Sequence, residues 1–103
     1  MPRPPKNLMQ LKQSAGEAAA LLRALGNESR LLVLCLLSSQ GEMSVGALQE
    51  EVGLSQSALS QHLARMRDEG LVTFRRDAQT LYYRIADPAA EKLVAALKDI
   101  FCP

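Results

Sequence analysis

The chain has 103 residues, of which 48% are hydrophobic and 22% are charged, and its formal net charge at pH 7 is only +1. This length predicts one domain, and the composition is that of a folded globular protein, which excludes a disordered or collagen-like chain. The nearly neutral total charge excludes a uniformly basic nucleic-acid-binding protein, and the small core predicted for this size favours self-association.

The amino-terminal end is polar and rich in proline, and it contains no hydrophobic segment of a signal peptide. We therefore expect residues 1–12 to form a flexible arm and residues 13–103 to form the folded domain. The longest apolar run, residues 31–37, has seven residues, well below the roughly 18 that a membrane span needs. The sequence thus predicts a cytoplasmic protein that does not bind membranes.

Two helices are predicted in the first part of the domain. Leucine and alanine recur at helical spacing over residues 13–25, and Gly26 and Asn27 can end this helix and cap the next. Residues 30–38 are apolar on every side, which predicts a helix at the centre of the core. A buried strand is the alternative, but leucine outnumbers β-branched residues there by five to one, which favours the helix.

A helix–turn–helix follows. Ser44 can cap a short helix with apolar residues at helical spacing. The turn after it combines a glycine, an apolar residue and a second serine cap over residues 53–55, and a longer helix is predicted over residues 56–69.

A β-hairpin and a last helix complete the predicted fold. Residues 71–76 and 81–86 are rich in β-branched and aromatic side chains, and the polar residues between them predict the tip of a hairpin. Asp87 and Pro88 begin a last helix with an apolar stripe. The order of elements predicts a mainly α-helical, winged helix-turn-helix protein with a small β-hairpin wing.

The helix predicted over residues 56–69 carries the strongest functional signal. Leu59, Leu63 and Met66 lie on one face and are expected in the core. The opposite face carries hydroxyl and amide side chains, which suit base edges and phosphates in the major groove better than the Glu and Lys of a solvated helix. An ordinary polar surface is the alternative. The predicted DNA contacts of this helix and its cap are Ser55, Gln56, Ser57, Ser60, Gln61, His62 and Arg65.

Two parts of this interface have specific alternatives. Arg75, Arg76 and Gln79 near the hairpin tip are predicted to reach the neighbouring minor groove or the DNA backbone, because the arginine guanidinium suits phosphates and guanine. A merely solvated hairpin is the alternative for each of them. His62 lies at the border between the buried and exposed faces, and a packed histidine bonded to the backbone is the alternative to a DNA contact.

Residues 25–37, 54–72 and 75–85 together resemble the ArsR/SmtB family of bacterial repressors. The resemblance covers residues 15–103, and its helix–turn–helix and wing segments are specific. It implies a homodimer built from the first and last helices, which grips a two-fold symmetric operator in double-stranded DNA and releases it on a chemical signal. Half-sites about one helical turn apart would follow from that symmetry.

Within the family, the resemblance also bears on the signal. Metal sensors use a thiolate pair in the second helix or Asp, His and Glu sets in the last helix, whereas this chain has Cys35 alone and its only histidine lies elsewhere. A closed zinc site needs four N or S ligands, so the sequence predicts no metal and no cofactor. A site between subunits that includes carboxylates such as Glu91 and Asp99 is the alternative.

The two single cysteines, Cys35 and Cys102, match the branch of the family (SqrR/BigR/HlyU-like) that responds to sulfide, persulfide or oxidants. In that branch the two cysteines become linked by a disulfide or polysulfide bridge, so the resemblance implies a redox-sensing pair. The residues alone allow an alternative interpretation, in which Cys35 is a small buried apolar residue and Cys102 is an incidental thiol near the carboxyl terminus.

The sequence therefore predicts a transcriptional repressor that binds operator DNA as a homodimer and is released when a reactive sulfur species or an oxidant links Cys35 to Cys102. A metal-responsive repressor of the same family and a winged-helix protein-interaction module are the alternatives. An enzyme with catalytic residues is not expected. The chain has one histidine, no nucleophile–base pair at a recognisable spacing and no glycine-rich phosphate loop.

Overall fold

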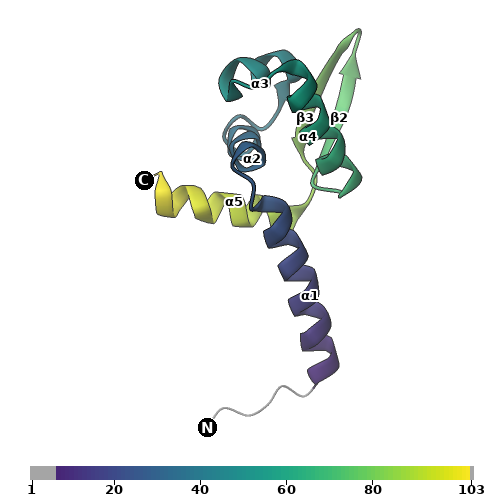
Figure 1. Ribbon diagram of the computed structural model, residues 1–103, viewed down its shortest axis with the longest axis vertical. Coiled ribbons are helices and arrows are strands. Elements are labelled where there is room, and N and C mark those ends of the chain that lie inside the picture. Colours follow the sequence, from purple (N-terminus) through teal and green to yellow (C-terminus); the bar gives the residue numbers. More distant parts are fainter. Residues whose placement is uncertain (1–6, 103) are drawn as a thin grey trace.

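The structure is a computed structural model that describes residues 7–102. Its elements follow the order of a winged helix-turn-helix, which confirms the predicted fold class (Figure 1). None of the described helices combines the length and the apolarity needed to cross a membrane. The elements are α1 (Leu8–Leu25), α2 (Glu28–Gln40), β1 (Met43–Ser44), α3 (Val45–Val52), α4 (Gln56–Asp68), β2 (Val72–Asp77), β3 (Thr80–Ile85) and α5 (Pro88–Phe101).

Helix α1 begins at Leu8, earlier than predicted. Asn7 caps it, because the side-chain oxygen of Asn7 accepts a hydrogen bond of 3.0 Å from the backbone N–H of Gln10. The predicted boundary at residue 13 therefore lies inside a helix, and residues 8–12 are helical. Residues 1–6 of the predicted arm lie outside the described residues. Figure 1 shows α1 projecting from the rest of the chain, and its first turns carry no core-facing stripe that would mark a helix in the sequence.

The core surrounds α2, as the apolar run predicts. Val33, Leu34 and Leu37 of α2 are buried, and they belong to one cluster with the buried leucines of α3 and α4 and the buried residues of α5. The sequence predicts that α2 is buried on every side, and this is wrong for the face that carries Leu32 and Cys35. Leu32 is 42% exposed, and Cys35 is only partly buried. One side of the central helix is therefore open.

The sheet has three antiparallel strands in the order β1-β3-β2, whereas the sequence predicts only the hairpin. The short strand β1 pairs Met43 with Tyr83, and two residues are too few to show an alternating pattern. In the hairpin, Asp77 pairs with Thr80, so the turn contains only two residues. Ala78 in this turn has φ of 56°, in the left-handed region that alanine seldom adopts.

One contact joins the wing to α4, and a second packs the two strands of the wing against each other. The guanidinium of Arg67 in α4 lies 5.2 Å from the ring centroid of Phe74 in β2, and the Phe74 ring lies 5.3 Å from that of Tyr83 in β3. Tyr83 is buried. Cation–π and aromatic contacts at these distances stabilise the orientation of the two elements, so the wing and α4 present one continuous surface.

Candidate nucleic-acid interface

The orientation of α4 is set by three buried side chains. Leu59, Leu63 and Met66 are at most 1% exposed, and they hold one face of the helix against the core. The opposite face is open to solvent, as the helical-wheel argument predicts. The exposed residues on or beside it are Ser55, Gln56, Ser57, Ser60, Gln61 and Arg65, and His62 is half-buried at its edge.

The amino-terminal end of α4 is built to meet an anion. The hydroxyl of Ser55 accepts a hydrogen bond of 3.1 Å from the backbone N–H of Ala58, which caps the helix. The N–H groups of Gln56 and Ser57, in the first turn, have no carbonyl partner within the helix. Gly53 adopts φ of 70° in the preceding turn, and this turn places that end of α4 at the surface. A phosphate group is a suitable partner for the free N–H groups.

The imidazole of His62 makes no hydrogen bond within residues 7–102. The structure therefore does not support the alternative of a histidine bonded to the backbone. A hollow of about 420 Å³ lies next to His62 on the face of α4, and Gln61, Arg65 and Asp68 also border it. His62 is thus accessible from the same side as the polar residues of α4.

Arg76 and Gln79 of the wing are exposed, but Arg75 has a partner that the sequence does not reveal. The Nε atom of Arg75 lies 3.1 and 3.0 Å from Oε1 and Oε2 of Glu42, and Nη2 lies 2.9 Å from Oε1. The guanidinium also stacks 4.4 Å from the ring centroid of Tyr82. These hydrogen bonds lower the pKa of Glu42 and raise that of Arg75. The guanidinium of Arg75 is therefore already paired with a carboxylate in the free protein.

The two cysteines lie on helices that pack against each other. Helix α5 contacts α2, and the Nζ of Lys98 in α5 donates a hydrogen bond of 2.6 Å to Oγ of Ser39 in α2. Cys35 precedes Ser39 by about one helical turn, and Cys102 follows Lys98 by about one turn. The Lys98–Ser39 contact therefore brings the segments that carry the two thiols together.

The electrostatics of Cys35 agree with this proximity. Burial raises the pKa of the Cys35 thiol, the nearby Cys102 raises it further, and the ammonium of Lys98 lowers it. Both cysteines are free thiols, and Cys102 is exposed. The sequence pattern identifies the two cysteines. The position of Lys98 near both of them follows from the packing of α5 on α2.

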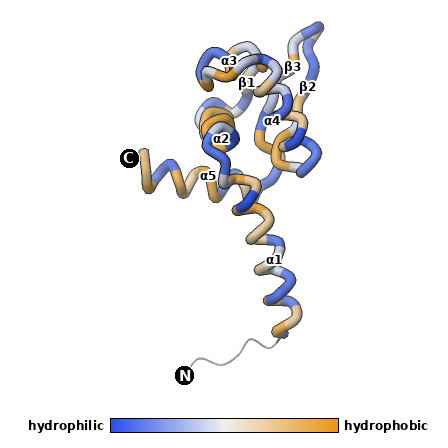
Figure 2. The backbone as a smooth tube through the Cα atoms, in the orientation of Figure 1, coloured by the Kyte–Doolittle hydropathy of each residue, from blue (hydrophilic) through white to orange (hydrophobic). Residues whose placement is uncertain are grey.

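Large exposed hydrophobic residues gather on the two helices that project from the body. Met9 on α1 is 81% exposed and Phe101 on α5 is 75% exposed. Figure 2 shows hydrophobic stretches along both helices. The other large exposed hydrophobic residues are Leu8, Leu11, Leu22, Leu32 and Ile100.

Among residues 7–102, no three side chains of His, Cys, Asp or Glu come together as metal ligands.

A helix–turn–helix whose second helix exposes a polar face, with a β-wing beside it, defines a winged helix-turn-helix domain of the DNA-binding class. Residues 27–73 match the family described as bacterial regulatory protein, arsR family. YgaV, an HTH-type transcriptional regulator of Escherichia coli (strain K12), is 52% identical over 93% of this chain and 97% of its own length. The chain belongs to the arsR family of bacterial regulatory proteins.

Solved structures agree with this assignment. Reduced HlyU from Vibrio cholerae N16961 is 41% identical with a TM-score of 0.88, over 93% of this chain and 100% of that chain. The transcriptional repressor BigR from Xylella fastidiosa is 38% identical with a TM-score of 0.84, over 93% of this chain and 94% of that chain. The chain is therefore a transcriptional regulator and not an enzyme.

Proposed function

We propose that this regulator is a homodimeric repressor that binds operator DNA and releases it when Cys35 and Cys102 become covalently linked. The single observation that carries the thiol part is the contact between α2 and α5, which holds a half-buried and an exposed free cysteine near one lysine. BigR, which is called a repressor, supports the direction of regulation, whereas HlyU is called a transcriptional activator. HlyU was solved in a reduced form, which supports the thiol part.

The DNA-binding part of the proposal rests on α4 and the wing. Helix α4 enters the major groove, where Gln56 and Gln61 offer amides that suit adenine and Ser57 and Ser60 offer hydroxyls. The cap at Ser55 meets a phosphate. The remaining contacts are made by His62 and Arg65 beside this face and by Arg75, Arg76 and Gln79 on the wing.

The dimer part rests on the exposed apolar residues of α1 and α5. Large hydrophobic residues exposed in such number mark an interaction site, and a second copy covers them with the same residues in an isologous, two-fold interface. Two copies of α4 then face the same side of the dimer. We expect their half-sites to be centred about 34–36 Å apart, one turn of DNA.

The thiol step balances with a persulfide as the oxidant. A cysteine thiolate attacks the outer sulfur of an organic persulfide RSSH, which leaves a protein persulfide and releases the thiol RSH. The second cysteine attacks the inner sulfur of the protein persulfide, forms the Cys35–Cys102 disulfide and releases H₂S. The two cysteines are oxidised, and the transferred sulfur is reduced. A bridge with one additional sulfur atom requires two molecules of RSSH: each cysteine becomes a persulfide with release of RSH, and the two persulfides condense to a trisulfide with release of H₂S.

A bridge between α2 and α5 is sufficient as a switch. Closing a loop of this length constrains the chain by about 4 kcal/mol in the entropy model. A difference of about 1–3 kcal/mol between DNA-competent and incompetent dimers already changes affinity about 5–150-fold. Because α5 also carries the exposed apolar residues of the proposed interface, a bridge at its end alters the relative position of the two copies of α4.

Fluorescence anisotropy with the DNA upstream of its own gene tests the proposal. We expect tight, salt-sensitive binding that weakens after treatment with glutathione persulfide and recovers with dithiothreitol. Intact-protein mass spectrometry counts the sulfur atoms added. The variants Cys35→Ser and Cys102→Ser should keep DNA binding and lose the response. If either variant still releases DNA normally, the thiol mechanism is wrong, whereas absence of DNA binding by the untreated protein contradicts the whole proposal.

A further inference from the structure

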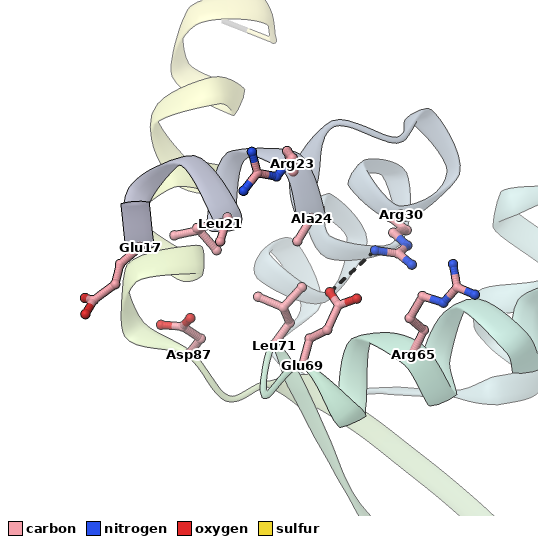
Figure 3. A pocket seen from close by; sticks show the side chains of 10 residues that line it. Glu17, Leu21, Arg23, Ala24, Arg30, Arg65, Glu69, Leu71 and Asp87 are labelled. Carbon is pink, nitrogen blue, oxygen red and sulfur yellow. Dashed lines mark hydrogen bonds and ion pairs between the residues drawn. The ribbon is translucent and has the colours of Figure 1, made fainter. Parts of the chain in front are cut away.

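We infer that a groove between α1 and the rest of the protomer binds a small dipolar ligand, with an ammonium group at one end and an anionic group at the other. The groove has a volume of about 620 Å³, within the range of roughly 300–1,000 Å³ typical of small-molecule sites. Its walls come from α1, the start of α2, the carboxyl-terminal end of α4 and the segments that precede β2 and α5 (Figure 3).

The middle of the groove is apolar. Leu21 and Ala24 lie on one face of α1, and both are partly buried against the core. Across the groove is the side chain of Leu71, which is itself buried. The bound molecule therefore has a short hydrocarbon body between its charged ends.

One end of the groove is basic. Arg30 is only 8% exposed, and its Nη1 lies 3.5 Å from Oε2 of Glu69, longer than the roughly 2.7–2.9 Å of a good charge-assisted hydrogen bond. Arg65 lies at the same end of the groove as Arg30 (Figure 3). The contact between Arg30 and Glu69 is long, and a nearly buried arginine gains from a closer anionic partner. Arg23 borders the groove nearer its middle, beside Leu21 and Ala24 (Figure 3). A carboxylate, sulfonate or phosphate fits this end.

The other end is acidic. Figure 3 shows Glu17 and Asp87 on the side of the groove opposite Arg30 and Arg65, with the apolar residues between them. The Oδ1 atom of Asp87 accepts a hydrogen bond of 2.9 Å from the N–H of Ala89, and its second oxygen is available to an ammonium group. A ligand with a single charge satisfies one end of the groove and leaves the other without a partner, so the site selects dipolar molecules.

Isothermal titration calorimetry of the full-length protein with three probes of similar length tests this inference. The probes are ε-aminocaproate, which carries both charges, hexanoate, which carries only the anion, and hexylamine, which carries only the cation. We expect saturable binding of ε-aminocaproate at least about tenfold tighter than that of either single-charge probe, the effect of one charge-assisted contact. No saturable binding, or equal affinity for the three probes, would overturn the inference.

A matched pair of variants locates the ammonium end. Asp87→Asn keeps the cap of α5, because asparagine caps helices as well as aspartate does, and it should reduce the tenfold preference for ε-aminocaproate over hexanoate to about equal affinity. Asp77→Asn makes the same change at the wing and should keep the preference. A full preference in Asp87→Asn would contradict the site. The titration involves no DNA and no thiol chemistry, so its result is independent of the proposed function.

Discussion

Arg75 and Glu42 form a bidentate ion pair that fastens the wing to the residue just before β1. Glu42 pairs with the guanidinium that the proposed function assigns to DNA. DNA binding through this arginine therefore requires an exchange of partners, from the carboxylate of Glu42 to a phosphate oxygen, while the stacking on Tyr82 can persist.

Replacing Glu42 with Gln should strengthen DNA binding, because Arg75 is released from its charged partner. We expect the slope of log affinity against log salt to become steeper by about one unit, the contribution of one additional phosphate contact. Fluorescence anisotropy over a series of salt concentrations measures this slope. Glu50→Gln removes an exposed carboxylate of α3 that has no contact with Arg75. The same change in both variants would exclude a role for Arg75.

Replacing Lys98 with Gln should slow the reaction of Cys35. The thiolate is the reactive form, and Lys98 lowers the pKa of Cys35. Without the cation that pKa rises, the thiolate fraction at neutral pH falls, and the profile of rate against pH moves to higher pH. Iodoacetamide alkylation in a Cys102→Ser background measures Cys35 alone. Lys92→Gln on the same helix is the control, and an equal effect of the two lysine variants would contradict the prediction.

The triple variant Ser57→Ala, Ser60→Ala and Gln61→Ala should lose sequence-specific DNA binding. Each lost base contact costs about 1–3 kcal/mol, so we expect the operator affinity to fall at least about tenfold. The melting temperature should change little, because these side chains are exposed. Anisotropy with operator and unrelated DNA, together with thermal unfolding, separates the two effects. Unchanged operator affinity would contradict base contacts by these residues of α4.

Replacing Phe101 with Glu should convert the proposed dimer to monomers. Phe101 is largely exposed in the protomer, and a charge placed at an apolar interface is left without a partner. Light scattering after size-exclusion chromatography reports the mass. Gln79→Glu introduces the same charge at the tip of the wing and should leave the mass unchanged. A Phe101→Glu protein that keeps the mass of the parent protein would contradict an interface that includes α5.

Most of the fold and the exposed face of α4 could be predicted from the sequence because they depend on local patterns. The spacing of Leu59, Leu63 and Met66 determines which face of α4 is buried, and Ser55 and Asp87 are residues of strong capping preference. These signals act within one or two helical turns. The structure agrees with the sequence for these caps and for the buried face of α4, but not for α2, where an all-round apolar pattern predicts burial that Leu32 lacks.

The features that sequence analysis missed depend on contacts between distant segments. Strand β1 is defined by its pairing with β3 and not by its own composition, and this pairing brings Glu42 next to Arg75. The contact of Lys98 with Ser39 likewise follows from the packing of α5 on α2. Helix α1 begins earlier than predicted because its first turns have no core-facing pattern.

Helix α1 has 18 residues, but only Leu25 at its end is buried in the protomer. Most of the stability of a helix in a protein comes from tertiary packing, and in α1 that packing is confined to its last turns, around Leu21, Ala24 and Leu25. If a second copy of the chain covers it, then folding of α1 is coupled to association, and the protein obeys mass action: its melting temperature rises with protein concentration. The cellular abundance of such a regulator would then govern how much of it is folded well enough to act.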